Sequence, residues 1–151
     1  MRKRISLALL SVVLIVALAH SATPMTYAGT EGCTPGYWKN NTSNWPPPFT
    51  PETRINAHFA AVWPETPVIF PGDPTMLQAL GTGGGGIYAL LRHTAAGLLN
   101  AAAREREFGY VDYHLDVPTL RGLVVEAFLS GDYESLKDYL ESLNEGYCPL
   151  G

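Results

Sequence analysis

The fold of this chain is decided by one segment, which reads Gly86-Ile-Tyr-Ala-Leu-Leu-Arg-His-Thr-Ala-Ala-Gly-Leu-Leu-Asn-Ala-Ala-Ala-Arg104. Its larger apolar residues recur at helical spacing, and small apolar residues occupy most of the opposite side. The first set is Ile87, Leu90, Leu91, Ala95, Leu98 and Ala102, and the second is Ala89, Ala96, Leu99 and Ala103. A helix that is apolar nearly all round is usually buried in the middle of a domain. The pattern therefore predicts a central helix around which the rest of the chain packs.

Three more helices are predicted, over residues 74–81, 117–131 and 132–146. An aspartate stands at each start and a glycine at each end, and these residue types favour the two ends of helices. Residues 108–115 alone have the alternating pattern of a strand. The expected fold is a small all-α domain of about four helices, with its helical core over residues 74–146.

The segment before these helices, residues 29–73, is predicted to be irregular. Eight of the twelve prolines lie between Pro46 and Pro74, and proline fixes φ and removes a backbone donor, so long regular elements are disfavoured. One short helix is expected from Pro51 to about residue 62, capped by Thr50. Aromatic residues are interleaved with the prolines, and we call the segment the N-terminal clamp because it is expected to bury these rings on the core.

The two cysteines, Cys33 and Cys148, lie near the two ends of the expected domain. Neither has a ligand partner at CxxC or CxH spacing, so a metal site is disfavoured. In an oxidising compartment two such cysteines most simply form one bridge. We expect a Cys33–Cys148 disulfide, which on the chain-entropy model is worth up to ~5 kcal/mol because it closes nearly the whole domain into a loop.

The first 28 residues have the pattern of a secretory signal. Residues 1–4 read Met-Arg-Lys-Arg, residues 5–19 are almost entirely apolar, and a small-x-small cleavage site ends at Ala28, with Ala19 as the competing position. An apolar run of this length is short of a membrane span, because a helix rises ~1.5 Å per residue and the hydrocarbon core is ~30 Å thick. We expect a secreted single domain, residues 29–151, with no stable membrane span after cleavage.

Composition limits the classes of protein to which the chain can belong. A length of 151 residues fits one domain, and 46% hydrophobic residues argue against a disordered chain. Loss of Arg2, Lys3 and Arg4 with the signal removes no acid and takes the formal net charge from −4 to −7. Nucleic acid is therefore not expected as a partner, since phosphate neutralisation needs surplus cations.

Asp112, His114 and Asp116 alternate along the strand-like segment and would share one face of it. Two carboxylates and an imidazole on one face are a weak candidate for a metal or calcium site. The competing interpretation is that Asp116 caps the next helix and that the alternation belongs to a solvated strand. We favour the second interpretation and expect no cofactor, with Ca²⁺ kept as the exception to test.

A polar seam is predicted along the central helix, where His93, Asn100 and Arg104 lie on roughly one line. Gly97 lies between them and would let another backbone approach closely. One interpretation is a functional polar pocket. The other is a hydrogen-bonded seam that fixes the clamp to the helix, because buried polar groups require partners. We favour the seam.

Two further motifs carry weaker signals. The glycine run 81–86 precedes a helix, as an anion-binding loop would, but no Lys-Ser or Lys-Thr follows it, so a flexible linker is favoured. Asn40 and Asn41 each begin an Asn-x-Ser/Thr sequon, which carries glycan only in a host that glycosylates exported asparagine. No serine, cysteine or carboxylate pair stands in a catalytic pattern, so no catalytic residue is assigned and a non-enzyme is expected.

Three stretches of the chain together form a recognisable set. They are Gly32-Cys-Thr-Pro-Gly-Tyr-Trp-Lys-Asn40 with Trp45 downstream, Thr75-Met-Leu-Gln-Ala-Leu80 through the glycine run to Asn100-Ala-Ala, and Gly131-Asp-Tyr to Cys148-Pro-Leu150. Over most of residues 32–150 the chain resembles an uncharacterised family of exported prokaryotic domains with a "CTPGYWKNH" motif. The resemblance implies a secreted, disulfide-closed helical module near cell surfaces or extracellular matrix, and it implies no activity.

The first of these stretches is interpreted as a structural motif. Pro35-Gly36 is expected to form a tight turn, Tyr37 and Trp38 to bury their rings, and Lys39 and Asn40 to satisfy backbone groups near helix ends. At one position the chain departs from the family, because the usual His after Lys-Asn is Asn41 here. A metal-ligating or catalytic role of that His in relatives would be lost, which favours structure over catalysis.

The leading functional hypothesis is a non-catalytic extracellular structural or interaction module. It would contact protein partners, a second copy included, in a surface layer, filament or matrix. The competing hypothesis is a glycan-binding module or secreted hydrolase, with Trp45, Trp63 or tyrosines as exposed stacking platforms and a carboxylate pair as acids. A calcium-stabilised surface module is the third.

Overall fold

The computed structural model describes residues 30–60, 69–104 and 111–151. The predicted signal segment 1–28 and Trp63 lie outside these ranges. The described parts of the chain form α-helices and two short 3₁₀ helices and contain no strand, so the predicted all-α fold is confirmed. The elements are α2 (Pro35–Asn40), η1 (Thr42–Asn44), η2 (Ile55–His58), α3 (Met76–Leu80), α4 (Ile87–Ala103), α5 (Val117–Ser130) and α6 (Tyr133–Asn144).

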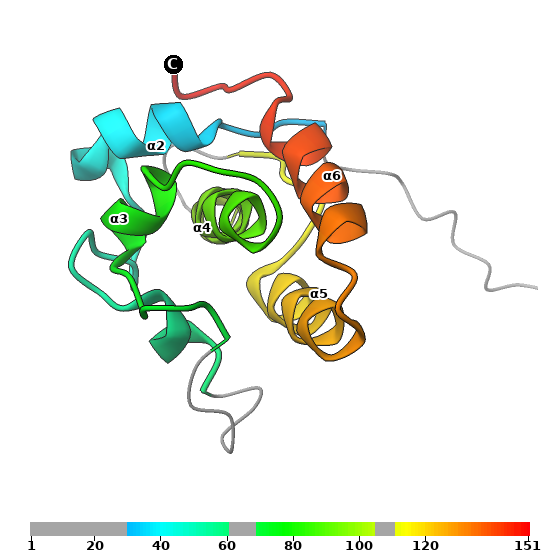
Figure 1. Cartoon of the computed structure of the whole chain (residues 1–151). Helices are drawn as coiled ribbons and strands as arrows, with labels where there is room; N and C mark the ends of the chain where they lie inside the picture. Colours follow the sequence, from blue (N-terminus) through cyan, green and yellow to red (C-terminus); the bar gives the residue numbers. More distant parts are fainter. Residues whose placement is uncertain (1–29, 61–68, 105–110) are drawn as a thin grey trace, which may run out of the picture.

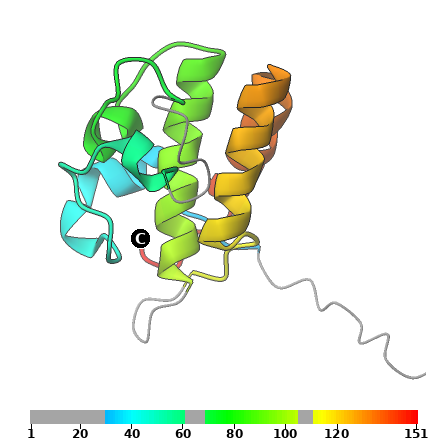
Figure 2. The same cartoon turned by 90° about the horizontal axis from the view of Figure 1, so that it is seen from below.

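The central helix predicted from residues 86–104 is α4. Figure 1 looks along its axis and shows α2, α3, α5 and α6 arranged around it, and Figure 2 shows it from the side. Almost every residue of α4 is buried, including the small residues on its second face. Those small residues let neighbouring elements approach from several directions, so α4 organises the core.

The predicted helix starts are right for α5 and α6 and two residues early for α3. Asp116 accepts a hydrogen bond from the backbone N–H of Thr119 at 2.8 Å and caps α5, and Asp132 caps α6 in the same way. At α3 the cap is Thr75, which exchanges hydrogen bonds with Gln78 in a capping box. The capping box satisfies two backbone donors at once, so it overrides the Asp-Pro signal before it.

The short helix expected from Pro51 does not form as an α-helix. Arg54 is extended and pairs with Thr75 in an antiparallel bridge, and only the 3₁₀ helix η2 follows it. The amide of Ile55 donates to the carbonyl of Pro74 at 3.0 Å. The backbone groups here form hydrogen bonds with the start of α3 instead of the bonds within an α-helix. The tertiary contact therefore overrides the local helix signal.

The strand-like prediction for residues 108–115 is wrong for the described part, residues 111–115. Val111, Tyr113 and Leu115 are buried and the polar residues between them are partly exposed, so the predicted alternation of faces holds. Within the described ranges no neighbouring strand pairs with this segment, however. Its backbone is satisfied instead by Glu31, whose amide and carboxylate both bond the backbone of Asp112.

Gly97 lies at a crowded point of α4. It was expected to admit another backbone, but side chains fill the space instead. A Cβ there would stand 2.7 Å from Cδ1 of Leu120 and 3.2 Å from the hydroxyl of Tyr113. We expect Gly97→Ala to lower the free energy of unfolding by about 1–3 kcal/mol, because overpacking outweighs the better helix propensity of alanine.

The matched control for Gly97 is Gly122 in α5, where a Cβ would meet nothing within 4 Å. Gly122→Ala should stabilise the protein by about 0.5–1 kcal/mol, since alanine costs less conformational entropy in a helix than glycine does. Urea denaturation of both variants measures the two effects. Equal effects of the same sign at the two positions would contradict the crowding assigned to Gly97.

His58 in η2 is expected to make stability depend on pH. Its ring is buried and packs on Phe49 with centroids 4.5 Å apart, and its Nε2 has no hydrogen-bond partner in the described parts of the chain. Burial, and then the charge of Arg121, lower the pKa of His58 from 6.5 to about 4. Between pH 6.5 and about 4, His58 is therefore protonated in the unfolded chain and neutral in the folded chain. The free energy of unfolding falls as the pH drops through this interval.

The His58→Gln variant tests this dependence because glutamine keeps polarity and cannot titrate. We expect wild type to lose about 1–2 kcal/mol more than His58→Gln over that pH interval, after allowance for screening by nearby solvent. Denaturant midpoints measured across the interval give the comparison. Parallel curves for the two proteins would show that His58 is not the titrating group.

Candidate functional site

The disulfide predicted between Cys33 and Cys148 is present. Their Cα atoms lie 4.6 Å apart, although 115 positions separate them in sequence. Beside the bridge the two ends of the domain run in contact, with the amide of Gly32 donating to the carbonyl of Tyr147 at 3.0 Å. A Cβ on Gly32 would collide with the carbonyl oxygen of Leu143, so glycine is needed for this approach. The bridge therefore joins both ends of the described domain over α4.

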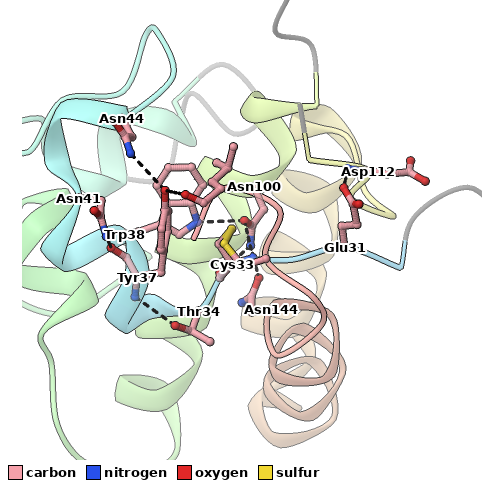
Figure 3. Close-up of a disulfide and its surroundings, with 12 residues drawn as sticks. Glu31, Cys33, Thr34, Tyr37, Trp38, Asn41, Asn44, Asn100, Asp112 and Asn144 are labelled. Carbon is pink, nitrogen blue, oxygen red and sulfur yellow. Dashed lines mark hydrogen bonds between the residues drawn. A yellow bond between two sulfur atoms is a disulfide. The ribbon is translucent and has the colours of Figure 1, made fainter. Parts of the chain in front are cut away.

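Asn100 is the centre of a buried hydrogen-bond network next to the bridge, shown in Figure 3. Its Oδ1 accepts from the backbone amide of Cys33 and from Nε1 of Trp38, both at 2.9 Å. Its Nδ2 donates to the carbonyl of Cys33 and to Oδ1 of Asn144, also at 2.9 Å. One side chain on α4 thus holds the clamp through two residues and α6 through a third.

Asn144 extends the network to the segment before α5 and to a second residue of α4. Its Oδ1 accepts from the hydroxyl of Tyr113 at 2.8 Å, and its Nδ2 donates to the carbonyl of His93 at 2.9 Å. Burial raises the pKa of Tyr113, so its hydroxyl stays protonated and able to donate. We call Asn100, Asn144, Tyr113, Trp38 and Cys33 the asparagine hub. Sequence reasoning missed Asn144, although it continues the spacing of Leu136 and Leu140 on the buried face of α6.

Only one of the three residues of the predicted polar seam has its side chain in the hub. Asn100 is the centre of the hub, as the seam interpretation expects. His93 contributes only its carbonyl to the hub, and its ring lies elsewhere. Arg104 is the C-cap residue of α4, and its backbone amide donates to the carbonyl of Asn100 at 3.2 Å. The guanidinium of Arg104 makes no hydrogen bond to the hub residues.

The predicted structural motif begins with a helix rather than a tight turn. Thr34 caps α2 by accepting from the amide of Tyr37 at 3.1 Å, and Pro35 and Gly36 form the first turn. Pro-Gly was interpreted as a turn, but a proline directly after a threonine cap is equally a helix start. The short helix turns Trp38 inward to Asn100 and leaves Lys39 and Asn40 exposed.

The remaining motif residues fasten the clamp to itself and to the C-terminal end. Tyr37 donates its hydroxyl to the carbonyl of Leu150 at 3.0 Å, and Asn41 donates its side-chain amide to the carbonyl of Tyr37 at 2.8 Å. Trp45 donates Nε1 to the carbonyl of Trp38 at 2.8 Å. The competing glycan-binding hypothesis needs Trp45 as an exposed stacking platform, and at this residue it is wrong, because only 6% of Trp45 is exposed. Its ring completes the core of the clamp.

Two of the three weak metal candidates, Asp112 and Asp116, have other roles, and the third, His114, is partly exposed between the buried Tyr113 and Leu115. Asp116 caps α5, and the hydrogen bonds from Thr119 hold the pKa of its carboxyl below the usual range. Asp112 bonds Glu31 through its backbone, and Figure 3 shows its carboxylate directed away from the bridge. No group of three or more metal-ligating side chains able to hold an ion is found in residues 30–60, 69–104 and 111–151.

A polar pocket of about 450 Å³ lies beside the hub, where α2, the loop after α3, α4 and α6 meet. Its charged lining comprises Lys39 and Arg92, from α2 and α4, and Glu141 and Glu145, at the C-terminal end of α6. His93 also lines it, with Nε2 3.8 Å from Oε1 of Glu141 and Nδ1 buried without a hydrogen-bond partner among the described residues. Burial lowers the pKa of His93, and the charge of Glu141 opposes this effect, so the ring is neutral at pH 7.

Gly81 and Thr82, at the start of the glycine run 81–86, line this pocket, and Arg92 holds the run in place. The run presents backbone carbonyls to Arg92, whose Nη1 donates to the carbonyl oxygens of Thr82 at 2.6 Å and Gly84 at 3.5 Å. A phosphate-binding loop presents amide hydrogens to its ligand instead. The arrangement argues against the phosphate-loop interpretation. The run is instead held in place by its hydrogen bonds with Arg92.

In the part of the chain that the structure describes, no helix is long and apolar enough to cross a membrane. Comparison of the chain with models of protein families, with curated proteins and with solved structures finds no match. The family resemblance drawn from the motifs stays a prediction, and the function has to be inferred from the site itself.

Proposed function

We propose that this protein is a secreted, non-catalytic interaction module of the cell surface or extracellular matrix. The observation that carries the proposal is the joint fastening of both ends of the described domain over α4, by the Cys33–Cys148 bridge and by the asparagine hub. Disulfides persist in oxidising compartments and are rare in the cytosol. Small domains with modest cores gain most from such a fastener.

The position of the motif residues supports an architectural role for the motif. Cys33, Trp38 and Trp45 point inward, and their polar groups are used by the hub and by the clamp. These motif side chains therefore stabilise the fold. A partner would contact other parts of the protein surface. The proposal assigns no catalytic residue and takes a protein, a second copy of this chain included, as the partner.

The first test asks where the protein is and whether its bridge is closed. The gene is expressed in an exporting host, and the culture medium, cell envelope and cytoplasm are analysed by mass spectrometry under non-reducing conditions with thiol alkylation. We expect the chain in the medium or envelope fraction with Cys33 and Cys148 unalkylated. Cytoplasmic protein with both thiols alkylated would overturn the secreted assignment.

The second test asks whether the module associates. Purified protein is examined by size exclusion and electron microscopy, with Ca²⁺ and with chelator, and is incubated with envelopes of the producing cells. We expect assemblies or envelope binding, and a melting shift with chelator would indicate a calcium-stabilised form. A strictly monomeric protein that binds neither cells nor envelope polymer would contradict the interaction role.

A further inference from the structure

The polar pocket beside the hub has a cationic side that the fold holds in place. Arg92 is anchored to the carbonyls of the glycine run by the two hydrogen bonds described above. Nζ of Lys39 lies over Gly81, only 3.3 Å from where a Cβ of that residue would stand. No described residue forms an ion pair with Lys39. One wall of the pocket thus carries an ammonium that forms no ion pair with any described residue.

The acidic side of the pocket comes from the last turns of α6. Glu141 and Glu145 are four residues apart and so lie on one face of the helix end. Glu141 is shared with Lys137, whose Nζ donates to it at 3.2 Å. Glu145 has no ion-pair partner among the described residues. An unpaired carboxylate therefore lines the same pocket as the unpaired ammonium.

His93 adds a neutral polar group to the lining of the pocket. The 3.8 Å between Nε2 and Glu141 is too long for a hydrogen bond, so the carboxylate does not satisfy this nitrogen. The ring itself is 96% buried, at 4% exposed surface, on the rigid central helix. A polar atom of a ligand between His93 and Glu141 would give Nε2 of His93 a partner that the described residues do not supply.

We propose that this pocket binds a small zwitterion carrying both a carboxylate and an ammonium group, as a free amino acid or a short peptide does. The carboxylate would lie on the Lys39 side, and the ammonium between Glu145 and Glu141 with His93 beside it. A ligand with a single charge would be attracted by one side of the pocket and repelled by the other. A volume of about 450 Å³ admits a molecule of this size. The proposal goes beyond the interaction role and does not depend on it.

The test is an NMR titration of the exported, oxidised protein at neutral pH. L-Alanine and glycylglycine are the zwitterionic probes, and acetate and methylammonium are the probes with one charge. We expect saturable shifts of the His93 ring, Lys39 and Glu145 signals with at least one zwitterion, and at least about tenfold weaker binding of either single-charge probe. The stronger of the two zwitterions tells a free amino acid from a peptide.

Variants locate the site. Lys39→Gln and Glu145→Gln should each weaken binding about tenfold or more, with unchanged melting because both side chains are exposed. Glu52→Gln, an exposed acid outside the pocket, is the matched control and should leave binding unchanged. Three results would overturn the proposal: no saturable shift with either zwitterion, equally tight binding of acetate or methylammonium alone, or binding that neither pocket substitution weakens.

Discussion

Replacing both bridge cysteines, Cys33→Ala with Cys148→Ala, is expected to lower the free energy of unfolding by about 3–5 kcal/mol. The bridge spans 115 positions, and on the chain-entropy model closing a loop of that length lowers the entropy of the unfolded chain by an amount worth about 5 kcal/mol. The folded contacts change little, because the backbone amide and carbonyl of Cys33 stay bonded to Asn100. The variant should therefore fold into the same structure and unfold far more easily.

Guanidinium denaturation followed by far-ultraviolet circular dichroism measures this loss. Reduced wild-type protein is the control, because it lacks the bridge without any change of sequence, and its midpoint should fall close to that of the double variant. The helical spectrum of both should match oxidised wild type at low denaturant. A loss below about 1 kcal/mol would mean that the bridge is not a principal fastener of the domain.

Asn100→Leu is expected to destabilise the protein by about 4 kcal/mol or more, which is a large fraction of the total stability of a domain of this size. Leucine has the same branched heavy-atom skeleton as asparagine and offers no hydrogen bonds. The amide of Cys33 and the indole N–H of Trp38 would lose their acceptor, and the carbonyl of Cys33 would lose its donor, all in a fully buried site. Each buried group left without a partner costs about 1–3 kcal/mol.

A double-mutant cycle separates the hydrogen bonds of Asn100 from its packing. Trp38→Phe removes the indole N–H, and its cost should shrink by about 1–2 kcal/mol when Asn100 is already leucine. Asn40→Leu, at an exposed position in the same motif, is the matched control and should change stability by less than about 0.5 kcal/mol. Purely additive effects at Trp38 and Asn100 would show that their bond carries no stability.

Sequence patterns were sufficient for the features that rest on local signals. The buried helix followed from apolar residues on all its sides, and the caps of α5 and α6 followed from Asp116 and Asp132. The bridge followed from the presence of only two cysteines in a chain whose first residues have the pattern of an export signal. Each of these inferences needs only the neighbouring residues or a simple count.

The features that sequence reasoning missed depend on contacts between distant segments. The competing glycan-binding hypothesis needs an exposed Trp45, yet the indole of Trp45 is buried and donates to the carbonyl of Trp38. In the sequence Asn144 is an ordinary polar residue at a helix end. Its hydrogen bond with Asn100 depends on the packing of α6 against α4. The polar pocket combines Lys39 with Glu145, which only the folded chain brings together. No local pattern encodes such pairings.

Asn100 holds the clamp to α4 through its hydrogen bonds to Cys33 and Trp38, and hydrogen exchange at the indole N–H of Trp38 tests this attachment. This proton is buried and bonded to Asn100 at 2.9 Å, so it can exchange only when the clamp leaves the helix. We predict that it exchanges as slowly as the most protected amides of α4, with a free energy equal to that of global unfolding. Exchange of this proton at the rate of an exposed indole, while the amides of α4 stay protected, would show that Asn100 does not hold the clamp to α4.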